Sequence, residues 1–203
     1  MNIGVFGGTF DPIHNGHLGV IEEARTQLRL DEVIFVPAGW PWLKSESPIS
    51  AVEHRVEMVR LAIENKPCCK ISTIEADKAG RSYTVDTIAE IKGQLGAELF
   101  FILGWDAMAR LPEWKEPSRL IEMCRLVAVP RPSHVVPDLK EPGAIVSGLS
   151  RRTVFMDKPH IDVSATEIRR RVAQNQSVSH LVPEPVDNYI EEHNLYKSTG
   201  GIA

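Results

Sequence analysis

Short apolar runs alternate with segments of helical spacing along most of the chain. The apolar runs that predict strands cover residues 2–6, 32–37, 70–75, 99–103, 126–129 and 153–156. Apolar positions recur at helical spacing over residues 16–28, 50–65, 84–95, 164–173 and 186–193. Strands with little polar interruption that alternate with helices indicate a parallel sheet covered by helices on both faces.

Helix ends and the last quarter of the chain refine this picture. Ser50 with Glu53, and Ser164 with Glu167, have the spacing of capping boxes. Residues 131–150 are rich in Pro, Ser and Gly and are predicted to form a loop. We expect one doubly wound α/β domain over residues 1–203, with a small helical C-terminal part at about residues 160–197. Ligands are expected at the carboxyl ends of the strands, near the topological switch point.

Composition and charge narrow the class of protein. The 203 residues are 43% hydrophobic and 25% charged, which is ordinary for a globular protein. The net charge of −4 gives no electrostatic footprint for nucleic acid, so we expect no nucleic-acid partner. Basic residues cluster locally at 151–152 and 169–171, which suits a small anion better than a long polyanion.

The sequence also predicts a cytoplasmic protein without a membrane partner. No apolar run approaches the roughly 20 residues that span a bilayer, and the first residues lack the basic start of a signal peptide. The cysteines, Cys68, Cys69 and Cys124, are odd in number and include an adjacent pair, which does not fit a disulfide framework. Reduced thiols are therefore expected. The sequence leaves a monomer and a homo-oligomer both open.

Residues 7–18, Gly-Gly-Thr-Phe-Asp-Pro-Ile-His-Asn-Gly-His-Leu, carry the clearest chemical signal. They connect the first predicted strand to the first predicted helix. Glycines let a backbone approach a phosphate, and a helix N-terminus adds N–H donors and a positive dipole end. His14 and His17 are three residues apart and can face the same way. The segment is predicted to hold and react a polyphosphate; the alternative is a pair of hydrogen-bonded structural histidines.

The spacing within this segment argues against other sites. It is not the G-x-G-x-x-G fingerprint of dinucleotide-binding dehydrogenases, and it lacks the Gly-Lys-Ser/Thr ending of a Walker loop. No third ligand is spaced for zinc beside the two histidines. Asp11 is interpreted as shaping the turn rather than binding a metal ion.

A second phosphate-binding segment is predicted where the helix over residues 164–173 begins, and we expect it to converge with residues 7–18 on a single triphosphate. Ser164 and Thr166 place hydroxyl and N–H groups there, and Arg169 lies one turn further along, where its planar fork can reach phosphate. The alternative is a capped surface helix with a solvated basic face. Arg170 and Arg171 are interpreted as ordinary surface charges.

Two further candidates follow predicted strands. Asp106, in Gly104-Trp105-Asp106, comes just after the strand over residues 99–103 and is well placed for ribose hydroxyls. The alternative role for this segment is the N-cap of the next short helix. Arg131 follows the strand that ends at Val129 and is a candidate for contact with phosphate.

Two separate stretches resemble a known superfamily. Residues 7–18 closely resemble the T/H-x-G-H signature of a nucleotidyltransferase superfamily. Residues 161–169 resemble its second signature, I-S-S-T-x-I-R, with Ala165 in place of the second serine. Residues 82–87, residues 104–106 and Trp114 resemble the bacterial nicotinate-nucleotide adenylyltransferase branch. The resemblance covers about residues 2–196.

The resemblance implies a Rossmann-like nucleotidyltransferase fold and adenylyl transfer from ATP to nicotinate mononucleotide, giving deamido-NAD and pyrophosphate. It implies Mg²⁺ carried mainly by the ATP phosphates and water, with no metal ligands from the protein. It assigns catalysis to His14, His17 and Arg169. It assigns ATP binding to Gly8, Thr9, Phe10, Gly104, Asp106, Arg131, Ser164 and Thr166, and mononucleotide binding to Lys44, Tyr83, Thr84 and Trp114.

The choice of mononucleotide depends on the last group. N–H groups at the helix start beside Tyr83 and Thr84 favour a carboxylate over a carboxamide, whose NH₂ would point a donor at a donor. The resemblance places Trp114 on the pyridine ring; the alternative is a core or rim tryptophan. Leu43 stands where the family has a histidine just before the lysine that matches Lys44.

Two other functions remain open from the sequence. One is another adenylyltransferase of the same superfamily, acting on pantetheine phosphate or nicotinamide mononucleotide; the segment at residues 82–84 and Trp114 count against the pantetheine enzyme. The other is a non-catalytic, nucleotide-binding regulatory module. Retention of His14, His17 and Arg169 counts against that module.

Overall fold

The protein is built on one six-stranded parallel sheet. The computed structural model describes residues 1–40, 49–130, 146–158 and 163–197. The strands lie in the order β3-β2-β1-β4-β5-β6, and every neighbouring pair is parallel. They are β1 (Asn2–Gly8), β2 (Glu32–Pro37), β3 (Cys69–Ile71), β4 (Glu98–Gly104), β5 (Cys124–Val129) and β6 (Thr153–Phe155). The predicted doubly wound sheet is confirmed.

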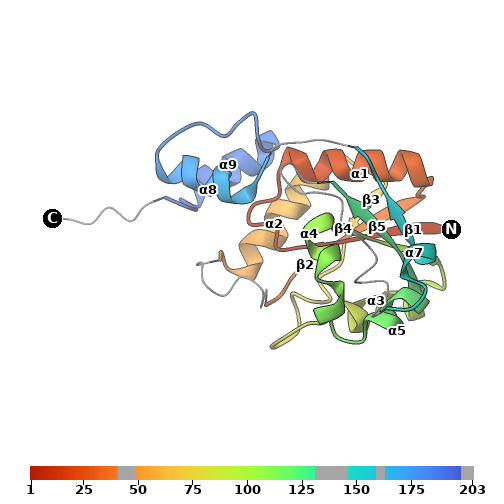
Figure 1. Ribbon diagram of the computed structural model, residues 1–203. Helices are drawn as coiled ribbons and strands as arrows, with labels where there is room; N and C mark the ends of the chain where they lie inside the picture. Colours follow the sequence, from red (N-terminus) through yellow and green to blue (C-terminus); the bar gives the residue numbers. More distant parts are fainter. Residues whose placement is uncertain (41–48, 131–145, 159–162, 198–203) are drawn as a thin grey trace.

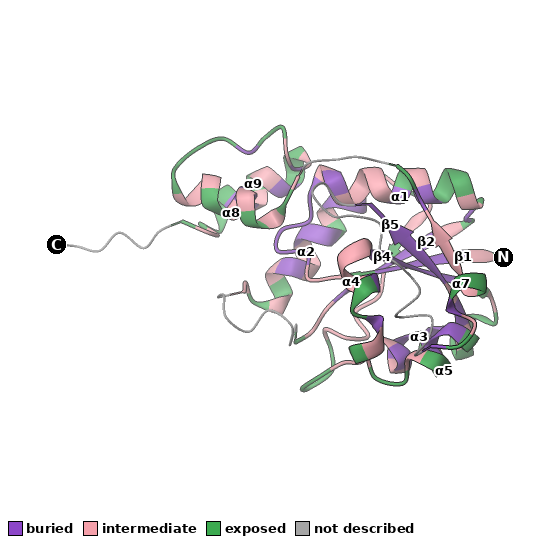
Figure 2. Cartoon of the chain, in the orientation of Figure 1, coloured by how far each residue is buried: buried purple, intermediate pink, exposed green. Residues whose placement is uncertain are grey.

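Helices cover both faces of this sheet (Figure 1). On one face lie α1 (Asn15–Leu28) and α2 (Val52–Ile63). Helices α8 (Ala165–Ala173) and α9 (Glu184–Glu192) pack against the same core at the carboxyl end of the sheet. On the other lie α3 (Thr84–Leu95), α5 (Pro117–Met123) and α7 (Leu149–Arg152). Alternate strand residues feed the two cores: Phe6 and Ile102 face the first, Val5 and Phe101 the second. Burial is therefore concentrated in the strands and on the inward helix faces (Figure 2).

The sheet order fixes where a ligand can bind. The chain builds β1, β2 and β3 outward on one side of the sheet and then returns to place β4 beside β1. The switch point therefore lies between β1 and β4, and crevices at such points are where open parallel sheets bind ligands. In Figure 1 the carboxyl ends of the central strands point toward α8 and α9. The C-terminal helices thus sit at the functional end of the sheet.

The start of α2 differs from the prediction, because Ser50 does not cap it. The N-cap residue is Ala51, which makes no side-chain cap. The Ser50 N–H donates to Asp11 Oδ2 at 3.2 Å, and its carbonyl accepts from Arg55 Nε at 3.0 Å. The backbone of Ser50 is thus committed to tertiary contacts. At α8 the prediction is half correct: Ser164 Oγ accepts from the Glu167 N–H at 3.2 Å, but the Glu167 carboxylate pairs with Arg170 and Arg171.

Strand β3 is shorter than the predicted run over residues 70–75. The chain turns after Ile71, where Thr73 Oγ1 donates to Asp77 Oδ2 at 2.7 Å and the Asp77 N–H donates to the Thr73 carbonyl at 2.8 Å. This side-chain turn ends the edge strand.

The short helix α4 (Trp105–Ala109) follows Gly104, as the N-cap alternative for residues 104–106 implied. Three other short helical segments were not predicted: the 3₁₀ turn η2 (Leu111–Glu113), α5 and α7. The last of these overlaps the end of the loop predicted over residues 131–150. None of the described helices has both the length and the apolar character needed to cross a bilayer.

Candidate active site at the carboxyl ends of β1 and β4

The turn between β1 and α1 has a backbone that only certain residues allow. Phe10 adopts a φ of 51°, in the left-handed region, which directs the chain back over the end of β1. Its ring then covers Gly8 so closely that a Cβ there would lie 2.9 Å from two ring carbons. Gly8 is therefore required by the packing of Phe10. The carbonyl of Thr9, between them, accepts a hydrogen bond from Arg55.

The two histidines form an unusual reciprocal cap at the start of α1. The His17 N–H donates to His14 Nδ1 at 3.3 Å, and the His14 N–H donates to His17 Nδ1 at 3.2 Å. The rings stack with centroids 3.7 Å apart. Because each Nδ1 accepts, the proton of a neutral ring is assigned to Nε2. Both imidazoles are thus fixed in the tautomer that uses Nε2–H as the donor.

His17 is also held by aromatic neighbours. Its ring meets Phe10 edge-on at 5.2 Å and Phe6 at 5.8 Å between centroids. These contacts leave the imidazole little rotational freedom, which is what a catalytic donor needs.

Backbone donors at the start of α1 are largely used within the protein. The Asn15 N–H donates to the Leu181 carbonyl at 2.9 Å, and the Leu18 N–H donates to the His14 carbonyl at 3.3 Å. With the His17 N–H also bonded, the sequence-based picture of unpaired N–H groups facing a phosphate needs correction.

The second signature lies against the first. Arg169 Nη1 donates to the main-chain oxygen of Asp11 at 2.7 Å, across 158 positions of sequence, and Nη2 lies 3.4 Å from Thr166 Oγ1. Ser164 caps the same helix. The two segments that the sequence predicted to converge are therefore neighbours. Arg170 is exposed, and Arg171 pairs with Glu167 beside it, as expected for surface charges.

Asp11 shapes the turn, in keeping with the interpretation of the sequence. It is only 3% exposed. Its Oδ1 accepts from the Tyr196 hydroxyl at 2.7 Å and its Oδ2 accepts from the Ser50 N–H at 3.2 Å. Both carboxylate oxygens are therefore used to hold other segments.

From the sequence, Arg55 either supports the loop that carries Lys44 or is solvated, and the structure shows that it is not solvated. Its side chain is buried, and its guanidinium donates to four main-chain oxygens, those of Thr9, Ala38, Gly39 and Ser50. Burial lowers the pKa of Arg55, an effect opposed by the charge of Asp11, and the group remains charged. It joins the end of β1 to the end of β2 and the start of α2. Apolar periodicity carries no signal for such a residue.

At the end of β4 the structure separates the roles suggested for residues 104–106. The alternative role of this segment, the N-cap of a short helix, belongs to Gly104, which is the N-cap of α4, and not to Asp106. Trp105 Nε1 donates to the Ala128 carbonyl at 3.3 Å, which ties this segment to β5. Asp106 lies in the first turn of α4, at the end of the strand that pairs with β1. This is the edge of the sheet that carries the histidine turn.

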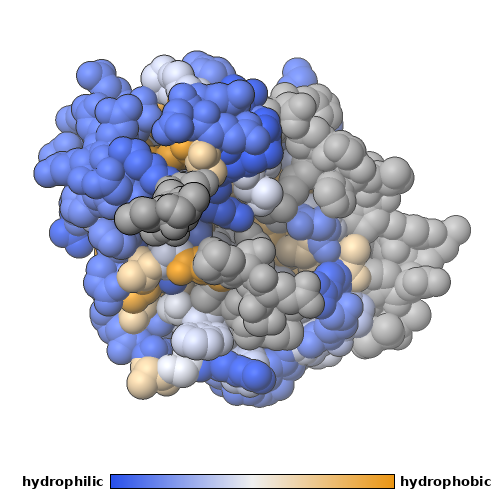
Figure 3. All heavy atoms as spheres, turned by 90° about the vertical axis from the view of Figure 1, so that its left-hand side faces the viewer, coloured by the Kyte–Doolittle hydropathy of each residue, from blue (hydrophilic) through white to orange (hydrophobic). Residues whose placement is uncertain are grey.

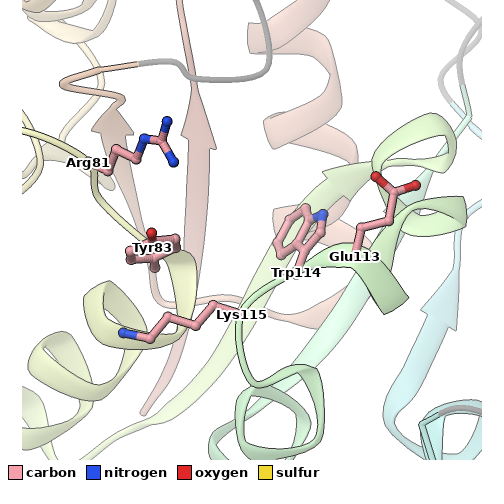
Figure 4. A pocket seen from close by; sticks show the side chains of 5 residues that line it. All are labelled: Arg81, Tyr83, Glu113, Trp114 and Lys115. Atoms are coloured by element: carbon pink, nitrogen blue, oxygen red, sulfur yellow. The ribbon is translucent and has the colours of Figure 1, made fainter.

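A hollow of about 460 Å³ lies beside the start of α3. Tyr83, the N-cap of α3, and Arg81 stand on one side, and Trp114 and Glu113 stand opposite them (Figure 4). Lys115 completes the lining, with its ammonium 4.7 Å from the centre of the Tyr83 ring and 2.9 Å from Asp86. The half-buried Trp114 contacts Phe101 edge-on at 6.0 Å. The hollow has an aromatic wall and two cations.

Three predicted features fall outside this geometry. Lys44, Leu43 and Arg131 lie outside the described residues.

The described part of the chain contains no cluster of three or more His, Cys, Asp or Glu side chains placed to bind a metal ion. The cysteines are free thiols, and burial raises the pKa of Cys69 and Cys124 to about 12. Thiols with such a pKa are poor nucleophiles.

Figure 3 views the molecule from the end where α8 and α9 lie. Hydrophilic side chains dominate its upper part, where these helices sit, and small hydrophobic areas show below them. The described surface that is visible at this end is thus mostly polar.

Comparisons with known proteins agree on one family. Residues 5–171 match the family model described as cytidylyltransferase-like. A "Probable nicotinate-nucleotide adenylyltransferase" from Dehalococcoides mccartyi is 46% identical over 97% of both chains. One of the same name from Roseiflexus is 42% identical over 96% of this chain and 98% of its own. The solved nicotinic acid mononucleotide adenylyltransferase of Plasmodium falciparum, complexed with NaAD, has a TM-score of 0.76 at 18% identity and covers 96% and 97%.

Proposed function

Because this chain belongs to the cytidylyltransferase-like family, we propose that it transfers the adenylyl group of ATP to nicotinate mononucleotide, giving deamido-NAD and pyrophosphate. The curated relatives that bear this activity in their names align over nearly the whole chain. The observation that carries the proposal is the hydrogen bond from Arg169 to the main-chain oxygen of Asp11. It brings both signature segments to one edge of the sheet.

The reaction requires positioning more than proton transfer. The nucleophile is a phosphate oxygen of the mononucleotide, already anionic at neutral pH, which attacks the α-phosphorus as the bond to the β-phosphate breaks. Pyrophosphate leaves with the bonding electron pair. The protein must hold two polyanions in line and stabilise the charge on the phosphoryl oxygens. In the proposal, His14, His17 and Arg169 do this, with the pinned imidazole of His17 donating from Nε2 in the transition state.

The remaining ATP contacts extend along the same edge. Hydroxyls of Ser164 and Thr166 and the backbone at Gly8, Thr9 and Phe10 face the phosphates in this proposal, together with Arg131. Asp106 and Gly104 lie at the end of β4 beside β1, where a carboxylate can accept from ribose hydroxyls. We propose that Mg²⁺ would be coordinated mainly by the ATP phosphates and water, which is how this ion usually binds in such sites.

The hollow beside α3 is the proposed site for the nicotinate ring. Trp114 offers a face for stacking, and the N–H groups at the α3 start, beside Tyr83 and Thr84, favour a carboxylate. Arg81 and Lys115 add positive charge, while the charge of Glu113 is countered by Arg110, whose hydrogen bond lowers the pKa of that carboxyl. These features favour the acid over the amide. Lys44 is proposed to reach the phosphate of the mononucleotide.

A substrate panel tests the proposal directly. The protein is incubated with ATP and Mg²⁺ and, separately, nicotinate mononucleotide, nicotinamide mononucleotide or phosphopantetheine, and pyrophosphate is measured. We expect the fastest release with nicotinate mononucleotide. Release only with phosphopantetheine would reject the proposal, and tight nucleotide binding without release from any substrate would indicate a regulatory module.

Replacing Trp114 should weaken binding of the mononucleotide specifically. Stacking of an aromatic ring on a base is worth about 1–3 kcal/mol, so Trp114→Ala is expected to raise the KM for nicotinate mononucleotide about tenfold. The KM for ATP should change less than twofold. Trp114→Phe keeps an aromatic face, so its KM for nicotinate mononucleotide should lie between those of the parent protein and the alanine variant. An unchanged KM for the mononucleotide in the alanine variant would remove Trp114 from the ring site.

A cytoplasmic location is part of the proposal, since it suits free cysteine thiols.

A further inference from the structure

The turn that carries His14 and His17 is held from the C-terminal part of the chain as well as from β1. The Leu181 carbonyl accepts from the Asn15 N–H at 2.9 Å, and the His180 carbonyl accepts from Asn15 Nδ2 at 3.2 Å. These contacts fix the first residue of α1. Residues 163–197 therefore do more than cover the sheet, because they contact the reacting segment itself.

Asp11 receives the remaining contacts from the same part of the chain. Its carboxylate accepts from the Tyr196 hydroxyl at 2.7 Å, and its main-chain oxygen accepts from Arg169 at 2.7 Å. A hydrogen bond from a hydroxyl to a buried carboxylate is charge-assisted and stronger than a neutral one. One residue thus joins the end of the chain to the arginine of the second signature.

Tyr196 can act as this donor throughout the neutral range. Burial raises the pKa of the Tyr196 phenol, and the neighbouring charge of Asp11 raises it further. The phenol therefore stays protonated throughout the neutral range. Tyr196 Oη also lies 3.9 Å from Met58 Sδ on α2, which fixes the ring against the first core.

We propose that Tyr196 and Asp11 are positioning residues for the phosphate site, and that their hydrogen bond sets the histidine turn against Arg169. This inference rests on the proposed adenylyl transfer. Without the Tyr196 hydroxyl, the buried Asp11 Oδ1 loses this hydrogen-bond donor. Solvation of that oxygen by water then requires the turn to shift. The main-chain oxygen that anchors Arg169 belongs to the same residue, so the arginine moves as well. Displacements of about 1 Å at such a site can cost on the order of a hundredfold in rate.

The test is Tyr196→Phe, which removes one oxygen and keeps the ring. We expect kcat/KM for ATP to fall about tenfold or more per titrated active site, while the KM for nicotinate mononucleotide stays within twofold. Tyr189→Phe is the matched control. It removes the hydroxyl that lies 2.9 Å from His54 Nδ1 and so loosens α9 from α2 without touching the turn. We expect this control to stay within twofold of the parent protein. Thermal unfolding of both variants reports their folding.

A double-mutant cycle separates positioning from general destabilisation. If Tyr196 acts on Arg169 through Asp11, the combined loss in Tyr196→Phe with Arg169→Lys will be smaller than the product of the single losses. A fully multiplicative result, an unchanged kcat/KM for ATP in Tyr196→Phe, or an equal loss in Tyr189→Phe would each overturn the inference.

Failure of the proposed function would be visible separately. A parent protein that releases no pyrophosphate contradicts adenylyl transfer. The Kd for ATP from calorimetry, with its stoichiometry counting folded sites, then reports on Tyr196. A tenfold weaker Kd in Tyr196→Phe but not in Tyr189→Phe supports the positioning role, and equal Kd values contradict it.

Discussion

The variant His17→Ala is expected to lower turnover on the order of a hundredfold or more, the usual loss when one preorganised donor to a transition state is removed. The reason is geometric. Nδ1 of His17 accepts from the His14 N–H, and the ring is stacked on His14 and packed edge-on against Phe10, so the imidazole is held in one orientation. In the proposed mechanism the Nε2–H of this ring donates to the transferring phosphoryl group. Pyrophosphate release at saturating ATP and nicotinate mononucleotide measures the effect.

A second substitution at the same position separates catalysis from capping. Removing a cap costs about 1 kcal/mol of stability, so His17→Ala should also lower the Tm slightly. In His17→Asn the amide oxygen can accept from the His14 N–H, but no donor stands where Nε2 was. We expect the asparagine variant to recover the Tm and not the turnover. A near-normal rate in either variant would remove His17 from the mechanism.

The largest expected effect on stability comes from Arg55→Met. The change leaves four main-chain oxygens without the donor that each now has, and a buried acceptor without a partner costs about 1–3 kcal/mol. The free energy of unfolding should fall by at least about 3 kcal/mol, even though methionine fills much of the same volume. Urea unfolding measures this as a lower midpoint with an unchanged slope.

Arg60→Met on the same helix is the control. Arg60 is 58% exposed and its Nε lies 3.6 Å from Glu57, a surface pair that is worth at most about 1 kcal/mol. Its removal should shift the midpoint little. Equal shifts for the two arginine variants would show that the buried guanidinium is not what holds these segments together.

Apolar runs were sufficient to predict the central strands and long helices, because those elements are buried on the faces that the runs define. The predictions were wrong where polar contacts determine the residue at which a strand or helix begins or ends. The side-chain turn from Thr73 to Asp77 ends β3 early, and Ser50 is drawn away from capping by Asp11 and Arg55. Helix α5 has only seven residues, too few to show a period.

At the candidate site, the sequence predicted the two signature segments and their meeting. It could not predict what holds them. Arg55 reaches oxygens up to 46 positions away, and Tyr196 reaches Asp11 from 185 positions away. Polar side chains with distant partners leave no periodic trace, and an arginine on a helix is compatible with solvent or with complete burial. The sequence kept hydrogen-bonded structural histidines as an alternative for His14 and His17, but it could not predict that each ring accepts from the backbone N–H of the other.

The same long-range link bears on how the enzyme becomes active during folding. Closing a loop costs entropy that rises only slowly, about 0.6 kcal/mol per doubling of its length, so a contact across 185 positions is affordable at equilibrium. Across proteins, folding is slower when contacting residues are far apart in the sequence, and we expect this contact to form after the contacts between neighbouring strands. The central sheet can therefore assemble while the reacting turn is still loose. During refolding, enzymatic activity should therefore return in a separate kinetic phase, after most of the secondary structure has formed.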